Sequence, residues 1–202
     1  TMKSIVFVMQ KCSRLIFITC CFCVVLGNAQ QKKEREFRVT REAIPEKALQ
    51  LLNPYLEDAK RVRYYQETDG SKKSFEVKFK KGKLRYSVEF NPEGNLEDVE
   101  FLIKSTDIPD ETWEAIQSEF QKKFSKTYVK KIQQQYPSEG KAEGEVLKEA
   151  FQNLILPYIR YELVVAGKTQ NHHRLYEILF DANGELLLFR EFAPTNYDHV
   201  LY

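Results

Sequence analysis

The side chains that could carry out chemistry in this chain are mainly carboxylates. Its 202 residues include 29 acidic residues, three histidines and four cysteines, and the cysteines are confined to positions 12–23. The Gly-x-Ser-x-Gly motif of a hydrolase nucleophile elbow and the glycine-rich loops that cradle phosphate groups do not occur. Outside that N-terminal stretch the sequence therefore contains no thiol nucleophile and no motif for acyl or phosphoryl transfer.

The histidines do not form a metal-binding pattern. His172 and His173 are adjacent, so on a strand their side chains point to opposite faces, and a shared metal would need carboxylates such as Asp181 or Asp198. Asp181 begins an Asp-Ala-Asn-Gly sequence that is similar to the start of a calcium loop but lacks the downstream bidentate glutamate. We therefore interpret the histidines as solvated strand-end residues and Asp181 as a turn residue, and we expect neither a metal nor a cofactor.

Four clustered acidic residues are the remaining catalytic candidates: Glu93, Glu97, Asp98 and Glu100. Paired carboxylates can hydrolyse a glycosidic bond when they face each other across a cleft. Because no pattern in the sequence predicts such a cleft, we interpret the group as the solvated side of a strand. We therefore predict that the protein is not an enzyme.

The elements that carry these residues are organised around a sixteen-residue stretch that occurs twice, at 86–101 and 176–191. At an offset of 90 the two copies share four residues, which are Tyr86/Tyr176, Phe90/Phe180, Gly94/Gly184 and Leu96/Leu186. Alternating apolar residues followed by an Asx-x-x-Gly sequence predict a β-hairpin in each copy. We expect Asn91 and Asp181 to bond the backbone of their turns, and we expect the two glycines to adopt a positive φ.

Each hairpin is preceded by a predicted helix and by further predicted strands. The tripeptides at 44–46 and 108–110 both read Ile-Pro-acidic and predict helix starts, because proline is favoured in a first turn. We expect Asp107 to cap the second helix. An extra amphipathic helix is predicted at about 145–154, inside the second unit.

Strand alternation predicts how these elements pack. Apolar residues lie on one face of the strands and charged residues on the other, so one face of the sheet must be covered by the helices. The patterns therefore predict an α+β fold of two tandem repeats, each a helix plus a four-stranded antiparallel meander, with the helices on one face of the sheet. Two arrangements stay open at this point, one continuous sheet or two separate lobes.

The first 29 residues have the features of a secretory signal peptide. Basic residues precede an uncharged run at 15–26, which is followed by Gly-Asn-Ala at 27–29, and we expect translation to start at Met2 or Met9. We expect cleavage after Ala29 and a periplasmic or secreted location. The apolar run is too short to span a bilayer, so no stable membrane insertion is expected after cleavage. Cleavage would also remove all four cysteines, so the mature fold would depend on its core rather than on disulfides.

Removal of the leader changes the charge balance. It takes away three of the 31 basic residues and none of the 29 acidic ones, which leaves a formal net charge of −1. A chain so close to neutral has no electrostatic basis for nucleic-acid binding, and we expect none. Residues 30–41 are charged and aperiodic and are predicted to be a flexible lead-in, and residues 194–202 are predicted to be a tail.

A family resemblance supports this organisation. The Ile-Pro-acidic helix start, the Phe-x-Val-x-Phe strand at 75–79 and the Tyr-x-Val-x-Phe-Asn-x-x-Gly-x-Leu hairpin at 86–96 resemble the PepSY-like domains of secreted bacterial proteins, also described as β-lactamase-inhibitor-protein-like, or BLIP-like. By this resemblance residues 42–104 form a first repeat and residues 105–193 a second, which departs from the pattern in its extra helix. The resemblance implies an exported, non-catalytic binding or inhibitor-like module whose open sheet face meets a partner.

We therefore predict that the chain contacts a protein or peptide of the cell envelope through the helix-free face of its sheet. Five residues of that face are the candidate contacts: Tyr65, Glu76, Lys78, Arg85 and Glu89. The alternative function is a periplasmic carrier that holds a small apolar ligand between the sheet and the helices. That alternative predicts an apolar cavity beneath Trp113 and Phe120.

Overall fold

The computed structural model describes residues 30–32, 34–169 and 172–192. The predicted signal peptide at 1–29, which holds all four cysteines, lies outside the described residues, and so does the predicted tail at 194–202. Within the described ranges, no helix combines the length and the apolar content needed to cross a membrane.

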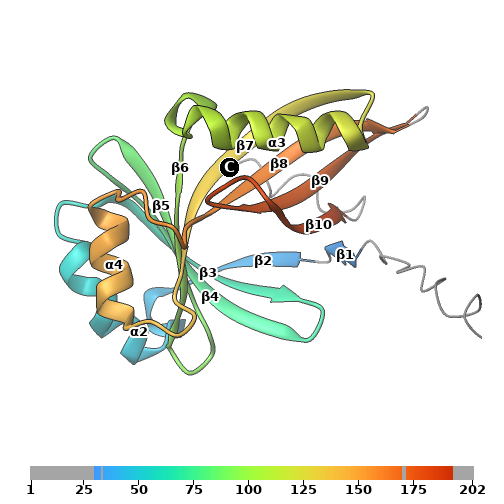
Figure 1. Ribbon diagram of the computed structural model, residues 1–202. Coiled ribbons are helices and arrows are strands. Elements are labelled where there is room, and N and C mark those ends of the chain that lie inside the picture. Colours follow the sequence, from blue (N-terminus) through green and yellow to red (C-terminus); the bar gives the residue numbers. More distant parts are fainter. Residues whose placement is uncertain (1–29, 33, 170–171, 193–202) are drawn as a thin grey trace, which may run out of the picture.

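A single ten-stranded sheet forms the body of the protein, in the order β1-β10-β9-β8-β7-β6-β5-β4-β3-β2 (Figure 1). Eight of its strands follow one another along the chain as an antiparallel meander, so the two predicted meanders join in one continuous sheet. These strands are β3 (Lys60–Asp69), β4 (Lys72–Lys81), β5 (Leu84–Phe90), β6 (Leu96–Leu102), β7 (Lys126–Pro137), β8 (Arg160–Thr169), β9 (His172–Asp181) and β10 (Leu186–Phe192). The pairing of β6 with β7 connects the halves.

The segment at 30–41 was predicted to be a flexible lead-in, and that prediction was wrong. β2 (Glu34–Val39) pairs antiparallel with β3, and β1 (Gln30–Lys32) pairs parallel with β10. The edges of β3 and β10 present backbone N–H and C=O groups that need partners, and this segment supplies them whatever its side-chain pattern. One short stretch of chain therefore reaches both edges of the meander.

Three helices cover one face of the sheet: α2 (Glu46–Leu52), α3 (Asp110–Lys123) and α4 (Glu143–Phe151). Pro45 and Pro109 occupy the N-cap positions of α2 and α3, as the Ile-Pro-acidic motif predicts to within one residue. Three short 3-10 helices complete the structure, namely η1 (Arg41–Ala43), η2 (Asn53–Tyr55) and η3 (Ser105–Asp107). Asp107 does not cap α3, because its carboxylate instead accepts the backbone N–H of Lys104, the N-cap residue of η3.

The core lies between the helices and the apolar face of the strands. Phe120 of α3 meets the Phe180 ring edge-on, with 5.9 Å between the centroids. α4 follows β7 in sequence but packs on the first half of the sheet, where Phe151 stacks on Tyr55 at 4.4 Å and on Tyr86 at 4.7 Å. α4 therefore completes the core beneath the N-terminal strands of the meander.

The two repeated turns have the same geometry. Asn91 and Asp181 each accept, through Oδ1, the backbone N–H groups two and four residues further on, at 2.8–3.1 Å. Gly94 and Gly184 follow with φ of 80° and 84°, as predicted. Each glycine lies against the first turns of a helix, Gly94 against α2 and Gly184 against α3, so a Cβ at position 184 would lie 2.7 Å from the carbonyl oxygen of Thr112.

Candidate functional site

The helix-free face of the sheet is concave. In Figure 1 the two halves of the sheet spread apart like the arms of a V, with the helices outside and β2 and β1 between the open ends of the arms. A cavity of about 810 Å³ lies on the inner side. Its charged and amide lining comes from both halves and includes Glu36, Glu67, Asp69, Lys72, Glu76, Lys78, Glu89, Asp98, Glu100, Gln133, Gln135, Glu162, Glu177 and Arg190.

Arg190 joins the first and last strands of the meander across this cavity. Its Nη1 atom lies 2.8 Å from Asp69 Oδ2 on β3, and its Nη2 atom lies 2.5 Å from Glu177 Oε1 on β9. Glu177 is only 1% exposed, so this carboxylate depends on the guanidinium group for its counter-charge. The contact shows that the meander curls far enough for the Arg190 side chain of β10 to reach Asp69 on β3, which makes the helix-free face an inner surface.

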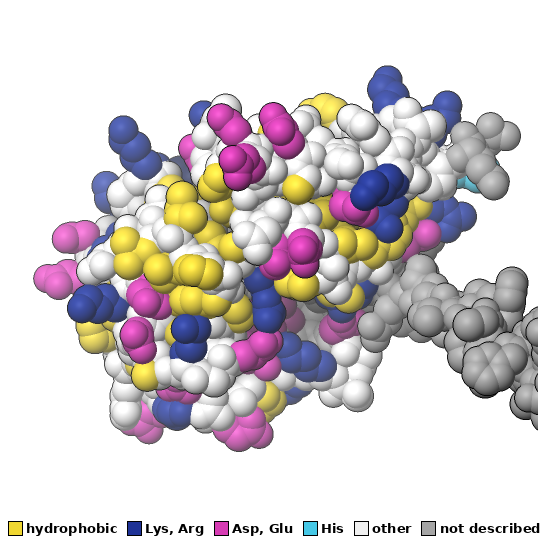
Figure 2. Space-filling view, viewed as in Figure 1, with side chains coloured by type: hydrophobic (Ala, Val, Ile, Leu, Met, Phe, Trp, Pro, Cys, Tyr) yellow, Lys and Arg dark blue, Asp and Glu magenta, His cyan; other side chains and the backbone are white. Residues whose placement is uncertain are grey.

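The face of the molecule seen in Figure 2 carries charges of both signs. Figure 2 shows basic and acidic side chains interspersed over the visible face, with apolar side chains between them. Charges of mixed sign in water largely screen one another, whereas charges grouped in a cavity interact strongly. The concave face also carries charges of both signs, and their partial burial strengthens the interactions between them.

All five residues predicted from the sequence as partner contacts line this one cavity: Tyr65, Glu76, Lys78, Arg85 and Glu89. The structure corrects their expected solvation, because Glu76 is only 8% exposed and Arg85 alone of the five is exposed. Tyr65 is half-buried, with the ammonium group of Lys78 4.9 Å from its ring centre. Alternation along the strands places the five on one face, and curvature then encloses most of them.

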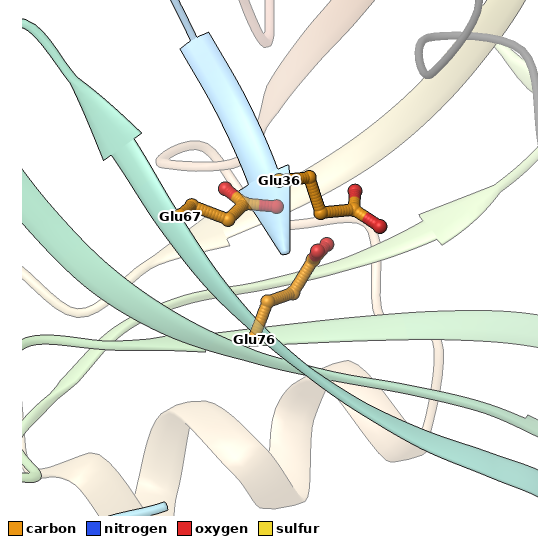
Figure 3. Close-up of side chains that lie close together, drawn as sticks. All are labelled: Glu36, Glu67 and Glu76. Atoms are coloured by element: carbon orange, nitrogen blue, oxygen red, sulfur yellow. The ribbon is translucent and has the colours of Figure 1, made fainter. Parts of the chain in front are cut away.

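Glu76 belongs to a cluster of three carboxylates, shown in Figure 3. Glu36, Glu67 and Glu76 come from β2, β3 and β4, and their nearest carboxylate oxygens lie within 4.8 Å of one another. Such a group could hold a metal, but Lys78 already lies among them, with Nζ 2.5 Å from Glu36 Oε2 and 2.8 Å from Glu76 Oε2. Ser87 donates a further hydrogen bond to Glu76. Sequence reasoning missed Glu36, because it lies in the segment that was predicted to be flexible.

The cluster has a consistent charge state. Burial alone would raise the pKa of Glu76, but its contacts with Glu67, Lys78 and Ser87 lower it below its usual value. Burial would likewise lower the pKa of Lys78, but Glu76 and Glu36 raise it. Lys78 therefore remains an ammonium group and supplies the positive charge that a metal would otherwise provide.

Glu89 lies on the same face, opposite Glu76 on the neighbouring strand. Lys72 Nζ lies 3.6 Å from Glu89 Oε1 and closer, at 2.8 Å, to Glu97 Oε2. Burial raises the pKa of Glu89 to about 7, because the hydrogen bond with Ser74 and the charge of Lys72 offset only part of the desolvation. This carboxyl therefore changes charge near neutral pH.

Asp98 and Glu100 differ from the other carboxylates of the cavity. Gln135 donates to Asp98 and Glu100, and Gln133 donates to Glu100. Among the described residues no basic side chain forms an ion pair with either carboxylate. Burial raises both pKa values well above their usual range, and the neighbouring acids raise them further.

The acidic group at 93–100 therefore needs a corrected interpretation. Glu93 is exposed at its turn, as expected of a solvated residue, and Glu97 pairs with Lys72. Asp98 and Glu100 instead face the cavity, where they are largely removed from water. The sequence placed them on the polar face correctly, but it carried no signal that this face is enclosed.

The other sequence candidates have simpler environments. His172 and His173 are both exposed at the start of β9, which confirms their interpretation as solvated strand-end residues. Phe120 contacts both Phe180 and Trp113, so aromatic rings fill the layer where a carrier would hold an apolar ligand. The cavity lies mainly on the opposite, polar face.

Comparisons with known proteins support the fold. No protein-family model matches the chain, and no curated protein matches it significantly. A putative periplasmic protein of Bacteroides eggerthii aligns with a TM-score of 0.50 at 15% identity, covering 73% of this chain and 88% of its own.

Two further Bacteroides structures align at 15% identity. One is a DUF2874 family protein of Bacteroides ovatus, with a TM-score of 0.49 over 73% of this chain and 87% of that one. The other is a BLIP-like protein of Bacteroides fragilis, with a TM-score of 0.48 over 78% and 92%. Of these likenesses, the one to the Bacteroides eggerthii structure, at a TM-score of 0.50, indicates a shared fold.

Proposed function

We propose that this chain is a periplasmic, non-catalytic binding module that holds a segment of a protein or peptide in the concave face of its sheet. The signal-peptide features of residues 1–29 support export, and the Bacteroides eggerthii neighbour is itself described as periplasmic. The single observation that carries the proposal is the curled sheet, whose helix-free face lines a cavity of about 810 Å³. The opposite face packs against α2, α3 and α4 through buried apolar side chains.

A binding role fits the chemistry of the cavity better than catalysis does. Its carboxylates are held by internal groups: Glu76 by Lys78, Glu177 by Arg190, and Glu100 by two glutamine amides. Groups arranged in this way can recognise a complementary surface without a reactive nucleophile.

Site-specific photo-crosslinking in the native host tests the proposal. A photoreactive amino acid would replace Tyr65 or Arg85, which line the cavity, or Gln117, which is exposed on α3 over the opposite face. We expect one discrete adduct from the cavity positions and none from position 117. Adducts of the same mass and yield from both faces would contradict binding in the cavity.

We also infer that the two halves of the sheet descend from one duplicated unit. The equal turn geometry at Gly94 and Gly184, and the contact of each glycine with the first turns of a helix, support this inference. In this interpretation α4 is a later insertion. A truncated chain that ends before η3 would test this inference. Truncation removes α4 and exposes the apolar surface that α4 covers, so a peptide with the sequence of α4 would be added. If the first unit is self-sufficient, the truncated chain with this peptide should unfold cooperatively.

A further inference from the structure

β1 and β2 follow each other in the chain and lie in line in Figure 1, yet they form opposite ends of the sheet. Lys32 on β1 lies beside Phe192, and Glu34 on β2 lies beside Asp69. Both of these partners line the cavity, so positions 32 and 34, which are two residues apart, keep the same face of the segment inward. β10 and β3 therefore lie on opposite edges of one extended segment.

The edge of this segment that faces β10 is used only at 30–32. Along β2 the same edge, which we name the open edge of β2, has no neighbouring strand within the described ranges. A strand edge without a neighbour presents backbone N–H and C=O groups and is a template for another extended segment. The open edge is therefore a candidate interaction surface.

β10 points along this open edge. It is parallel to β1, and the pairing of Gln30 with Arg190 and of Lys32 with Phe192 sets an offset of 160 between the two strands. β10 ends at Phe192, which is only 2% exposed, and residues 193–202 follow outside the described ranges. At the same offset and in the same direction, residues 194–199 would lie beside residues 34–39.

We propose that residues 194–199 extend β10 and add to the open edge of β2 as a parallel strand. The ladder that begins between β1 and β10 would then continue along β2. The two ends of the sheet would thereby be joined at the side of the cavity. This inference goes beyond the proposed function, because it requires no ligand.

Side chains of the two segments are complementary at this offset. Phe37 is 51% exposed on the face opposite the cavity, and Tyr197 would lie beside it, so the two rings could pack. Arg38 is exposed, and it lies beside the cavity residue Tyr65. Asp198 would be its neighbour and would supply the opposite charge. A shift by one position would exchange the faces and lose both pairs.

The tail is a better occupant of the open edge than a separate chain. It is joined to Phe192, whose position is already fixed by the pairing of β10 with β1, so its pairing is intramolecular and costs less entropy than association. Ala193 precedes Pro194, and a residue before proline favours extended backbone. Pro194 has no N–H group to donate, which is tolerated near the start of a strand.

Amide hydrogen exchange, followed by NMR, tests the proposal. The chain 30–202 is compared with a chain that ends at Ala193. We expect the β2 amides that do not donate to β3 to exchange at least about 10-fold more slowly in the longer chain. Amides of the β4–β5 ladder report on global opening and should exchange equally in both. Nuclear Overhauser contacts between Phe37 and Tyr197 would establish the register.

A charge exchange provides a second test that keeps the whole chain, so it decides the question even if the truncated chain does not fold. Arg38→Glu should speed exchange at the open edge by about 2- to 5-fold through the loss of one ion pair, and adding Asp198→Lys should restore it. Arg35→Glu is the matched control on the same strand. Residue 35 would lie beside Thr195, so this variant should exchange as the wild type does.

Equal exchange at the open edge in the two chains would overturn the proposal, and so would a failure of Asp198→Lys to restore protection in Arg38→Glu. Contacts that place the tail beside β2 in another register would overturn it as well. Protection that persists in the chain ending at Ala193 and rises with protein concentration would assign the edge to a second copy of the protein instead. Crosslinking from Tyr65 tests the proposed function separately, since it does not depend on this pairing.

Discussion

Glu89 offers the sharpest test of the enclosed cavity. Its pKa is raised by burial from 4.5 to about 7. Some carboxyl groups have a higher pKa in the folded state than in the unfolded state. Such a group contributes its full stabilisation at a pH below its unfolded-state pKa, and this contribution is lost as the pH rises through its folded-state pKa. Glu89 therefore favours folding below about pH 4.5 and opposes it above about pH 7.

The substitution Glu89→Gln replaces this carboxyl with a neutral group of the same shape. A difference of about 2.5 pKa units corresponds to about 3 kcal/mol, which is the largest stabilisation expected from the variant above pH 8. Lys72 loses one carboxylate but keeps Glu97 at 2.8 Å, so the loss of the ion pair is small. Below pH 4.5 both proteins carry a neutral group at position 89, and their stabilities should agree.

Urea denaturation of both proteins from pH 4 to pH 8.5 measures this effect as a difference in the free energy of unfolding. Taking the difference removes the contribution of other acids, including Glu76, whose pKa is shifted in the opposite direction. Glu93→Gln, at an exposed position in the same hairpin, should differ from the wild type by less than about 0.5 kcal/mol at any pH. If Glu89→Gln were destabilising at pH 8, or if its effect did not depend on pH, the inference that this carboxyl is desolvated would be wrong.

Two further substitutions test the architecture. Gly184→Ala places a Cβ 2.7 Å from the Thr112 carbonyl oxygen at a φ of 84° and should cost about 3 kcal/mol, whereas Gly70→Ala, with φ of 62° and nothing within 4 Å, should cost about 1 kcal/mol. Equal thermal shifts would refute the helix contact. Arg190→Met removes the guanidinium group from buried Glu177 and should cost about 3–5 kcal/mol in chemical denaturation, with part of the loss recovered by adding Glu177→Gln. A double variant no more stable than Arg190→Met would argue against this pairing.

Most elements of the fold could be predicted because their signals are local. The Asx-x-x-Gly turns and the Ile-Pro-acidic helix starts depend on the conformational preferences of a few neighbouring residues. β2 could not be predicted in this way, because its pairing with β3 satisfies an edge that exists only after the meander has formed. The position of α4 over the first half of the sheet is likewise a matter of packing between distant segments.

The candidate site was likewise predictable only in its local features. Strand alternation by itself determined that Tyr65, Glu76, Lys78, Arg85 and Glu89 share one face, because the two-residue period of a strand is a local property. Only the tertiary structure decided that this face is enclosed, through the contact of Arg190 with Asp69 across 121 positions of the chain. Twist between neighbouring strands is small and accumulates over the whole sheet, so no single stretch of sequence encodes which carboxylates lose their water.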